Sequence, residues 1–137
     1  MKKILFLILL MSLTACTTAD KNFVDINNKR IQVEVVDTAE AQYRGLSNRE
    51  NLCQDCGMLF VFGDKQMRTF VMRDMKFSLD IIWIDEDKII KIDKSLLPEG
   101  PDPINKYSSK EPVDYVLEVE AGFADKNNIK IGDEVNF

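Results

Sequence analysis

Short apolar runs separated by turn-forming residues constrain what this 137-residue chain can fold into. Residues 31–35 and 113–119 alternate apolar and polar side chains, which is the period of a half-buried strand. Further runs between Gly, Asn and Asp residues lie at 23–26, 58–62, 67–73, 79–85, 88–92 and after Gly132. The pattern predicts a mainly β (α+β) single domain, a small barrel or sandwich of about seven short strands with two or three short helical turns.

Two of the helical turns are expected between the early strands. Thr38 can cap a helix over residues 39–44. Ser47 and Glu50 have the spacing of a capping box, so a second helical turn is predicted to run toward Cys53.

Residues 93–112 show no periodicity and contain all four prolines. Long irregular segments inside a compact domain are uncommon and are usually functional or mobile. The segment is therefore expected to be either a stiff crossover that wraps the sheet or a lid, and the sequence leaves both interpretations open.

The first sixteen residues have the pattern of an export signal. Lys2 and Lys3 precede an apolar run over residues 4–13, which is too short to span a bilayer. The sequence Leu13-Thr14-Ala15-Cys16 resembles the lipobox of bacterial lipoproteins, in which the cysteine is acylated and becomes the first mature residue. We therefore expect a signal peptide at 1–15, a lipidated Cys16 with a tether up to residue 22, and one domain at 23–137.

This prediction places the domain outside the cytoplasm, anchored by lipid to a bacterial membrane. A tether over residues 17–22 reaches roughly 20 Å when fully extended. Without Lys2 and Lys3, 16 basic residues face 23 acidic ones, so the net charge is −7. Nucleic acids and anionic lipid headgroups are disfavoured as partners, because both require basic patches.

The chain contains no histidine. This excludes serine–histidine and cysteine–histidine triads, histidine general bases and most zinc sites. No cofactor is predicted, and any catalysis would depend on carboxylates, Lys, Tyr or Cys.

The order of several short segments is similar to that of domain-of-unknown-function family 192. The segments are Thr38, Arg44-Gly45-Leu46, Gly57-Met58-Leu59-Phe60-Val61-Phe62, Phe70-Val71-Met72-Arg73, Leu79-Asp80-Ile81-Ile82, Val116-Leu117-Glu118-Val119, Ala121-Gly122 and Ile131-Gly132-Asp133. The resemblance implies a compact, mainly β domain, often exported or membrane-anchored, without an established activity. Two departures affect polar positions: Val71-Met72-Arg73-Asp74-Met75 stands where the family tends to have Trp-Met-Lys-Asn-Thr, and Ser78 where it tends to have proline.

Cys53 and Cys56 remain as a pair once Cys16 is acylated. Outside the cytoplasm such a pair usually forms a disulfide. A structural bridge is the favoured interpretation, and a thiol–disulfide centre or a soft-metal site that includes nearby methionines stays an alternative. The expected position at the end of a helical turn beside Asp55 disfavours a reactive thiol.

The carboxylates indicate one candidate pocket, formed by Met72, Arg73 and Asp80. Asp80 begins an apolar strand, so it is expected either to pair with Arg73 in a cavity or to accept hydrogen bonds from backbone N–H groups. Glu118 is expected to be solvated, and Asp133 to serve a turn.

The leading hypothesis is a small-ligand or partner-binding module of the cell envelope, which is expected not to be an enzyme. The expected partner of this module is an unknown small molecule or an envelope protein, and not a nucleic acid. The first alternative is a thiol–disulfide or soft-metal protein that uses Cys53 and Cys56. The second is a carboxylate-dependent hydrolase of an envelope polymer, centred on Asp80.

Overall fold

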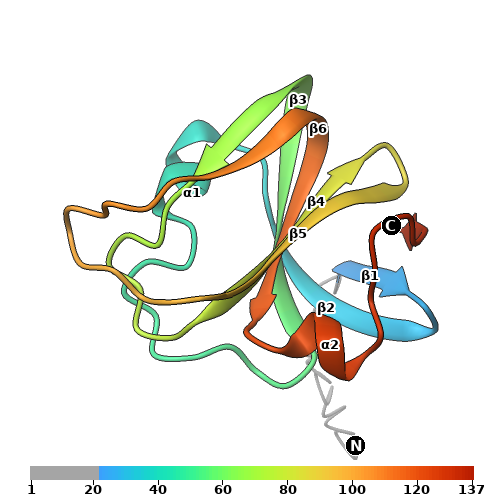
Figure 1. Cartoon of the computed structure of the whole chain (residues 1–137), viewed down its shortest axis with the longest axis horizontal. Helices are drawn as coiled ribbons and strands as arrows, with labels where there is room; N and C mark the ends of the chain where they lie inside the picture. Colours follow the sequence, from blue (N-terminus) through green and yellow to red (C-terminus); the bar gives the residue numbers. More distant parts are fainter. Residues whose placement is uncertain (1–21) are drawn as a thin grey trace, which may run out of the picture.

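A curled sheet of seven strands forms the body of the protein (Figure 1). The computed structural model describes residues 22–137. In chain order the elements are β1 (Asn22–Ile26), β2 (Lys29–Val36), α1 (Ala39–Arg44), β3 (Cys56–Phe70), β4 (Leu79–Asp85), β5 (Lys88–Leu96), β6 (Tyr107–Glu120), α2 (Phe123–Lys126) and β7 (Val135–Asn136). The predicted mainly β fold with about seven strands is therefore confirmed.

The strand order is β5-β4-β6-β3-β2-β1-β7, and the sheet curls into a half-barrel. Its two edges meet near the C-terminus. The Ile89 N–H donates to the Asp133 carbonyl at 3.1 Å, and the Gly132 N–H donates to the Ile89 carbonyl at 2.8 Å. These bonds satisfy backbone groups that an open edge strand would leave unpaired.

The β1–β2 hairpin follows from its turn residues. Asn27 and Asn28 have φ angles of 50° and 64°. Positive φ at both central residues is the requirement of a type I′ hairpin turn, and asparagine tolerates it better than most residues. The predicted hairpin is confirmed, with Phe23 opposite Gln32 in the register.

Helix α1 lies in the crossover between β2 and β3, which run parallel. The Thr38 hydroxyl accepts the Ala41 N–H at 3.3 Å, and Gly45 ends the helix with a φ of 49°. The predicted helix over residues 39–44 is confirmed.

The predicted helical turn from Ser47 to Cys53 is wrong. The Ser47 hydroxyl donates to the Arg73 carbonyl at 2.8 Å, and the φ of 64° at Asn48 is incompatible with an α-helix. The predicted strands at 58–62 and 67–73 are also merged into one long strand, β3. Pairing with β6 continues on both sides of residues 62–65, with a register shift between them.

The irregular segment is shorter than predicted. Strand β5 extends to Leu96 and β6 begins at Tyr107, so only residues 97–106 lack regular structure. The Glu99 N–H donates to the Met72 carbonyl at 3.0 Å, and the Asp74 N–H donates to the Gly100 carbonyl at 3.2 Å. These bonds attach the segment to the residues after β3, as the crossover interpretation requires.

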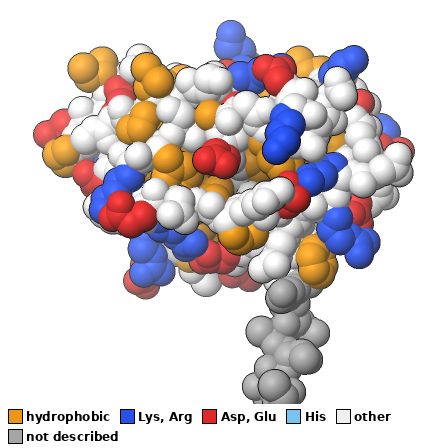
Figure 2. Space-filling view, turned by 90° about the horizontal axis from the view of Figure 1, so that it is seen from below, with side chains coloured by type: hydrophobic (Ala, Val, Ile, Leu, Met, Phe, Trp, Pro, Cys, Tyr) orange, Lys and Arg blue, Asp and Glu red, His pale blue; other side chains and the backbone are white. Residues whose placement is uncertain are grey.

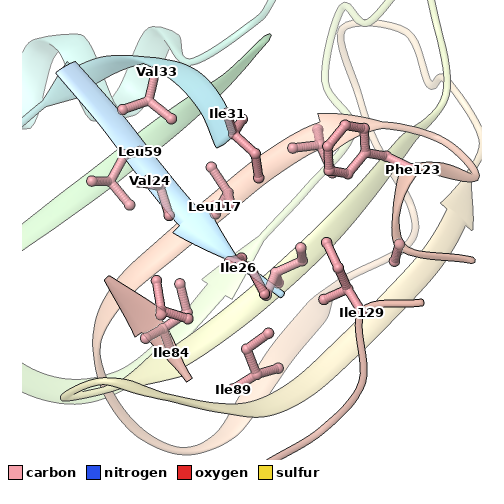
Figure 3. Close-up of a cluster of buried hydrophobic side chains, with 14 residues drawn as sticks. Val24, Ile26, Ile31, Val33, Leu59, Ile84, Ile89, Leu117, Phe123 and Ile129 are labelled. Carbon is pink, nitrogen blue, oxygen red and sulfur yellow. The ribbon is translucent and has the colours of Figure 1, made fainter. Parts of the chain in front are cut away.

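The sheet has a hydrophobic cluster on each face. One cluster contains side chains from all seven strands and from α2, so it fills the interior of the half-barrel (Figure 3). The other lies on the opposite face and contains Met58, Phe60, Ile81, Trp83 and Val116. Because the central strands β3, β4 and β6 contribute to both clusters, they are apolar on both faces.

No helix within residues 22–137 is long and apolar enough to cross a bilayer.

Candidate functional site

A cavity of about 570 Å³ lies on the outer face of the sheet, beside the second hydrophobic cluster. Its walls come from α1 and the residues after it, from β3, from the segment after β3, and from one residue of β6. The volume is in the range of small-molecule sites, which extend over about 300–1,000 Å³.

Side-chain hydrogen bonds attach α1 and the following loop to the opposite wall. The Gln42 amide donates to the Val61 carbonyl at 2.8 Å, which fixes the helix on β3. The Ser47 hydroxyl bond to the Arg73 carbonyl joins the loop after α1 to the segment after β3. The cavity walls are therefore held by bonds between segments far apart in the sequence.

Aromatic side chains line much of the cavity. Phe60, Phe62 and Phe70 come from β3, and Tyr43 comes from α1. The Phe60 and Phe70 rings meet edge to face with centroids 4.8 Å apart. Such contacts hold the rings in place, and they present apolar surface to any molecule in the cavity.

Three arginines border the same cavity: Arg44, Arg68 and Arg73. Arg68 pairs with Asp64 and stacks on Phe62, with the guanidinium carbon 4.0 Å from the ring centroid. Arg73 stacks on the Tyr43 ring, also at 4.0 Å, and its Nη2 donates to the Tyr43 carbonyl at 2.6 Å.

Arg44 and Arg73 are the two arginines of residues 22–137 without an ion pair to a carboxylate. The others pair with Asp25, Glu34 and Asp64. Figure 2 shows one face of the molecule, on which acidic and basic side chains are interspersed. Two arginines at the cavity therefore keep charge that the protein itself does not neutralise at close range.

Arg44 also acts at longer range on a nearby carboxylate. The pKa of Glu34 is held below its ordinary value, chiefly by the hydrogen bond from Arg49 and to a smaller extent by the charge of Arg44.

Glu118 is the carboxyl group of the cavity, and the prediction that it is solvated is wrong. In the sheet it lies between Met58 of β3 and Ile81 of β4, both part of the second hydrophobic cluster. Its residue surface is only 5% exposed, and it lines the cavity. Alternation along β6 was correctly recognised, but the face assigned to solvent is covered by α1 and the following loop.

Burial raises the pKa of the Glu118 carboxyl from an ordinary 4.5 to about 8. Within residues 22–137 its side chain has no hydrogen bond or ion pair. At neutral pH the group is therefore mostly a neutral carboxylic acid, which has one O–H to donate and oxygens to accept.

The structure separates the three residues of the predicted pocket. Arg73 lines the cavity, whereas Met72 and Asp80 are fully buried and do not line it. The Asp80 carboxylate accepts the Ser95 N–H at 2.8 Å and the Ala124 N–H at 3.0 Å. The backbone-capping interpretation of Asp80 is supported, and the suggested ion pair with Arg73 is not formed.

Asp80 joins β5 and α2 to β4, which explains its burial. Its two oxygens satisfy two backbone donors that would otherwise be unpaired. It is a structural carboxylate and leaves Glu118 as the one carboxyl that lines the cavity.

Cys53 and Cys56 form a disulfide, with Cα atoms 5.3 Å apart. Cys53 is exposed and Cys56 is buried at the start of β3. Neither lines the cavity. Of the four methionines in the soft-metal alternative, Met58 and Met72 are buried in the second hydrophobic cluster, and Met67 and Met75 line the cavity. The loop also contains no helix, so the expected helical position of the pair is wrong.

One further prediction has a defined outcome. Asp133 serves a turn as expected, because its carboxylate accepts the Lys130 N–H at 2.7 Å. The predicted signal peptide and the predicted lipidation at Cys16 lie outside the residues that the structure describes, so both stay predictions.

The sequence contained one signal for Glu118. Val116, Leu117 and Val119 surround it, so both faces of β6 are apolar next to a single acid. A strand that is apolar on both faces is central in its sheet, and an acid there is buried. The sequence contained no comparable signal that Met67 and Thr69 belong to a cavity wall.

The fold and the cavity define the class of protein: a small, single-domain β half-barrel with a cavity of about 570 Å³ on its outer face. The chain belongs to the DUF192 family, described as Uncharacterized ACR, whose model matches residues 22–137. No protein among the curated sequences matches it.

Two solved structures are similar to this chain. A protein of unknown function from Novosphingobium aromaticivorans DSM 12444 is 29% identical, with a TM-score of 0.78 and 84% of each chain covered. A protein from Sinorhizobium meliloti 1021, whose description proposes a role in transcription regulation, is also 29% identical, with a TM-score of 0.73. That match covers 78% of this chain and 81% of the other.

Proposed function

We propose that this chain is a binding protein whose cavity takes a small amphipathic anion. The observation that carries the proposal is the position of Arg73 and Arg44. Both border a cavity of about 570 Å³, and neither is paired with a carboxylate in a domain where the other arginines are.

Arg73 supplies the main contact to the anionic end. Its Nη2 is bonded to the Tyr43 carbonyl, and stacking on Tyr43 fixes the plane of the guanidinium. The remaining N–H groups have no hydrogen-bond acceptor within residues 22–137. A planar guanidinium fixed in this way binds a carboxylate or phosphate with little loss of side-chain entropy.

The aromatic wall supplies the contact to an apolar body. Phe60, Phe62 and Phe70 line the cavity together with Leu46 and Val71. Burial of apolar ligand surface on these side chains contributes roughly 25 cal/mol per Å² before the costs of association. The segments that carry the family resemblance, among them residues 44–46, 58–62 and 70–73, are also segments of this wall.

We also propose that the domain is lipid-anchored at Cys16 and works at the cell envelope, as the lipobox predicts. Feeding cells an alkyne-labelled fatty acid tests this. Wild type and a Cys53→Ser/Cys56→Ser double variant should carry the label, and Cys16→Ser should not. A label that persists in Cys16→Ser, or wild type without a label in the membrane fraction, would contradict the anchor.

Nucleic acid is not a favoured partner of this chain, despite the description of the Sinorhizobium protein. The 22 acidic and 15 basic residues at 22–137 carry a net charge of −7. Duplex binding depends on neutralising phosphates with clustered Lys and Arg. An electrophoretic shift with random duplex DNA at low salt would contradict this expectation.

Matched ligands test the binding proposal. Isothermal titration of the full chain with 3-phenylpropanoate should show binding, whereas the neutral amide of the same acid should bind about tenfold more weakly or less. Arg73→Gln and Arg44→Gln should weaken binding of the acid, with the larger loss at Arg73.

Arg30→Gln is the matched control, because Arg30 pairs with Asp25 and lies outside the cavity wall. It should leave the affinity unchanged. Equal affinities for acid and amide, or equal effects of the Arg73 and Arg30 substitutions, would remove the basis of the proposal.

A further inference from the structure

Among residues 22–137, Glu118 is the one polar residue of the cavity wall that is buried. The other polar side chains of the wall, such as Gln42, Ser47 and Arg73, are at least partly exposed. Glu118 is 5% exposed, and its strand neighbours Met58 and Ile81 close it off from solvent along the sheet. The carboxyl therefore lines the cavity from a buried position.

A carboxyl without a partner at such a position is unfavourable for folding. Leucine would fit an apolar central strand without leaving a polar group unsatisfied. The protein offers Glu118 no hydrogen-bond partner within residues 22–137. Since the residue lines the cavity, a partner can reach the carboxyl from there.

We infer that Glu118 is the second recognition point of the cavity and donates a hydrogen bond to a neutral acceptor oxygen of the bound molecule. This rests on the proposed anion binding at Arg73. The ligand class is then narrower: an amphipathic anion with its charge at the arginines and a carbonyl, ether or hydroxyl oxygen at Glu118.

The protonation state of Glu118 decides whether its carboxyl acts in the cavity as a hydrogen-bond donor or as an anion. Arg44 from α1, Arg68 from β3 and Arg73 after β3 line the same cavity, and their charges favour the ionised form of Glu118. The neighbours in register on β3 and β4 are the uncharged Met58 and Ile81. The effect of burial is larger than that of the arginine charges and raises the pKa of Glu118 to about 8. A neutral acid donates to an oxygen, whereas a carboxylate would bind an ammonium group.

Three probes that differ in one group test the inference: 3-phenylpropanoate and its para-acetyl and para-aminomethyl derivatives. Each is titrated into the full chain by calorimetry at pH 7 and pH 9.5. The acetyl probe should bind about five- to tenfold more tightly than the unsubstituted acid at pH 7. The advantage should disappear at pH 9.5, where Glu118 is ionised.

Two variants separate hydrogen bonding from charge. Glu118→Gln keeps N–H donors and should retain the acetyl advantage at both pH values. Glu118→Leu removes the donor and should abolish the advantage of the acetyl probe over the unsubstituted acid at pH 7.

The outcomes distinguish this inference from the function on which it rests. If the unsubstituted acid binds through Arg73 and acetylation gives no advantage, the inference fails and the anion site stands. Tightest binding of the aminomethyl probe, lost in Glu118→Gln, overturns the inference in favour of an ionised Glu118. If no probe binds, both the function and the inference fail.

Discussion

Burial of Glu118 makes the stability of this protein fall as the pH rises, and replacement by glutamine isolates the effect. The pKa of the carboxyl is about 8 in the folded protein and 4.5 ordinarily. Between these two values the native state binds one proton that the unfolded chain releases. The contribution of Glu118 to the free energy of unfolding therefore decreases with pH across this window and is constant outside it.

The slope follows from linkage. One additional proton on the native state lowers the free energy of unfolding by about 1.4 kcal/mol per pH unit. Across the whole window the loss is roughly 4 to 5 kcal/mol, an upper value because a charged Glu118 can draw water into the cavity. A domain of this kind is stable by only about 5–15 kcal/mol, so the loss is large.

Urea unfolding of wild type, Glu118→Gln and Glu120→Gln at pH 5, 6, 7, 8 and 9 measures the effect. Glu120 is two residues further on β6 and exposed, so its substitution should leave the slope unchanged. Wild type and Glu118→Gln should be similar in stability at pH 5, and Glu118→Gln should be the more stable by several kcal/mol at pH 9. A difference that stays constant from pH 5 to pH 9 would refute burial of a neutral Glu118.

Three substitutions test the rest of the structure by urea unfolding, with 3-phenylpropanoate titration as the second readout. Gly57→Ala should lower the free energy of unfolding by about 2 kcal/mol or more, because its Cβ would lie 2.7 Å from the backbone carbonyl oxygen of Glu118. An unchanged free energy of unfolding would contradict this close approach of β3 to β6. Asp80→Ala should cost about 3 kcal/mol by leaving two backbone donors unpaired, with the intrinsic affinity of the folded protein unchanged; a loss of affinity would place Asp80 in the site. Removing the disulfide with Cys53→Ser/Cys56→Ser should cost about 2 kcal/mol, since the closed loop has only four residues, and should not affect binding; an altered affinity would revive the thiol alternative.

Local sequence was sufficient to predict a turn or a helix cap where the hydrogen bonds and backbone angles that form it involve neighbouring residues. Asn27 and Asn28 form the predicted turn, and Thr38 caps α1, because each acts on backbone atoms within a few residues. Ser47 has the same capping chemistry, but its hydroxyl bonds to the Arg73 carbonyl, 26 residues away. A capping pattern states what a hydroxyl can bind, and the fold decides what it does bind.

The site was predicted in part for the same reason. Arg73 was predicted to belong to a candidate pocket with Met72 and Asp80, and it lines the cavity. Asp80 was proposed as its partner, but backbone N–H groups of β5 and α2 are closer to its oxygens. The distance between two side chains 7 residues apart depends on the path of the loop between them, which periodicity does not describe.

The sequence by itself determined the class of fold, since the spacing of apolar residues and turns sets which segments form strands and how many there are. Period two along β6 also showed that Glu118 and Leu117 point to opposite faces. Only the tertiary structure decided that both faces are covered, because the half-barrel interior buries one and α1 with its loop covers the other. Because both faces are covered, Glu118 is a neutral acid that lines a cavity and not a solvated carboxylate. The environment of a carboxyl group shifts its pKa away from the ordinary value.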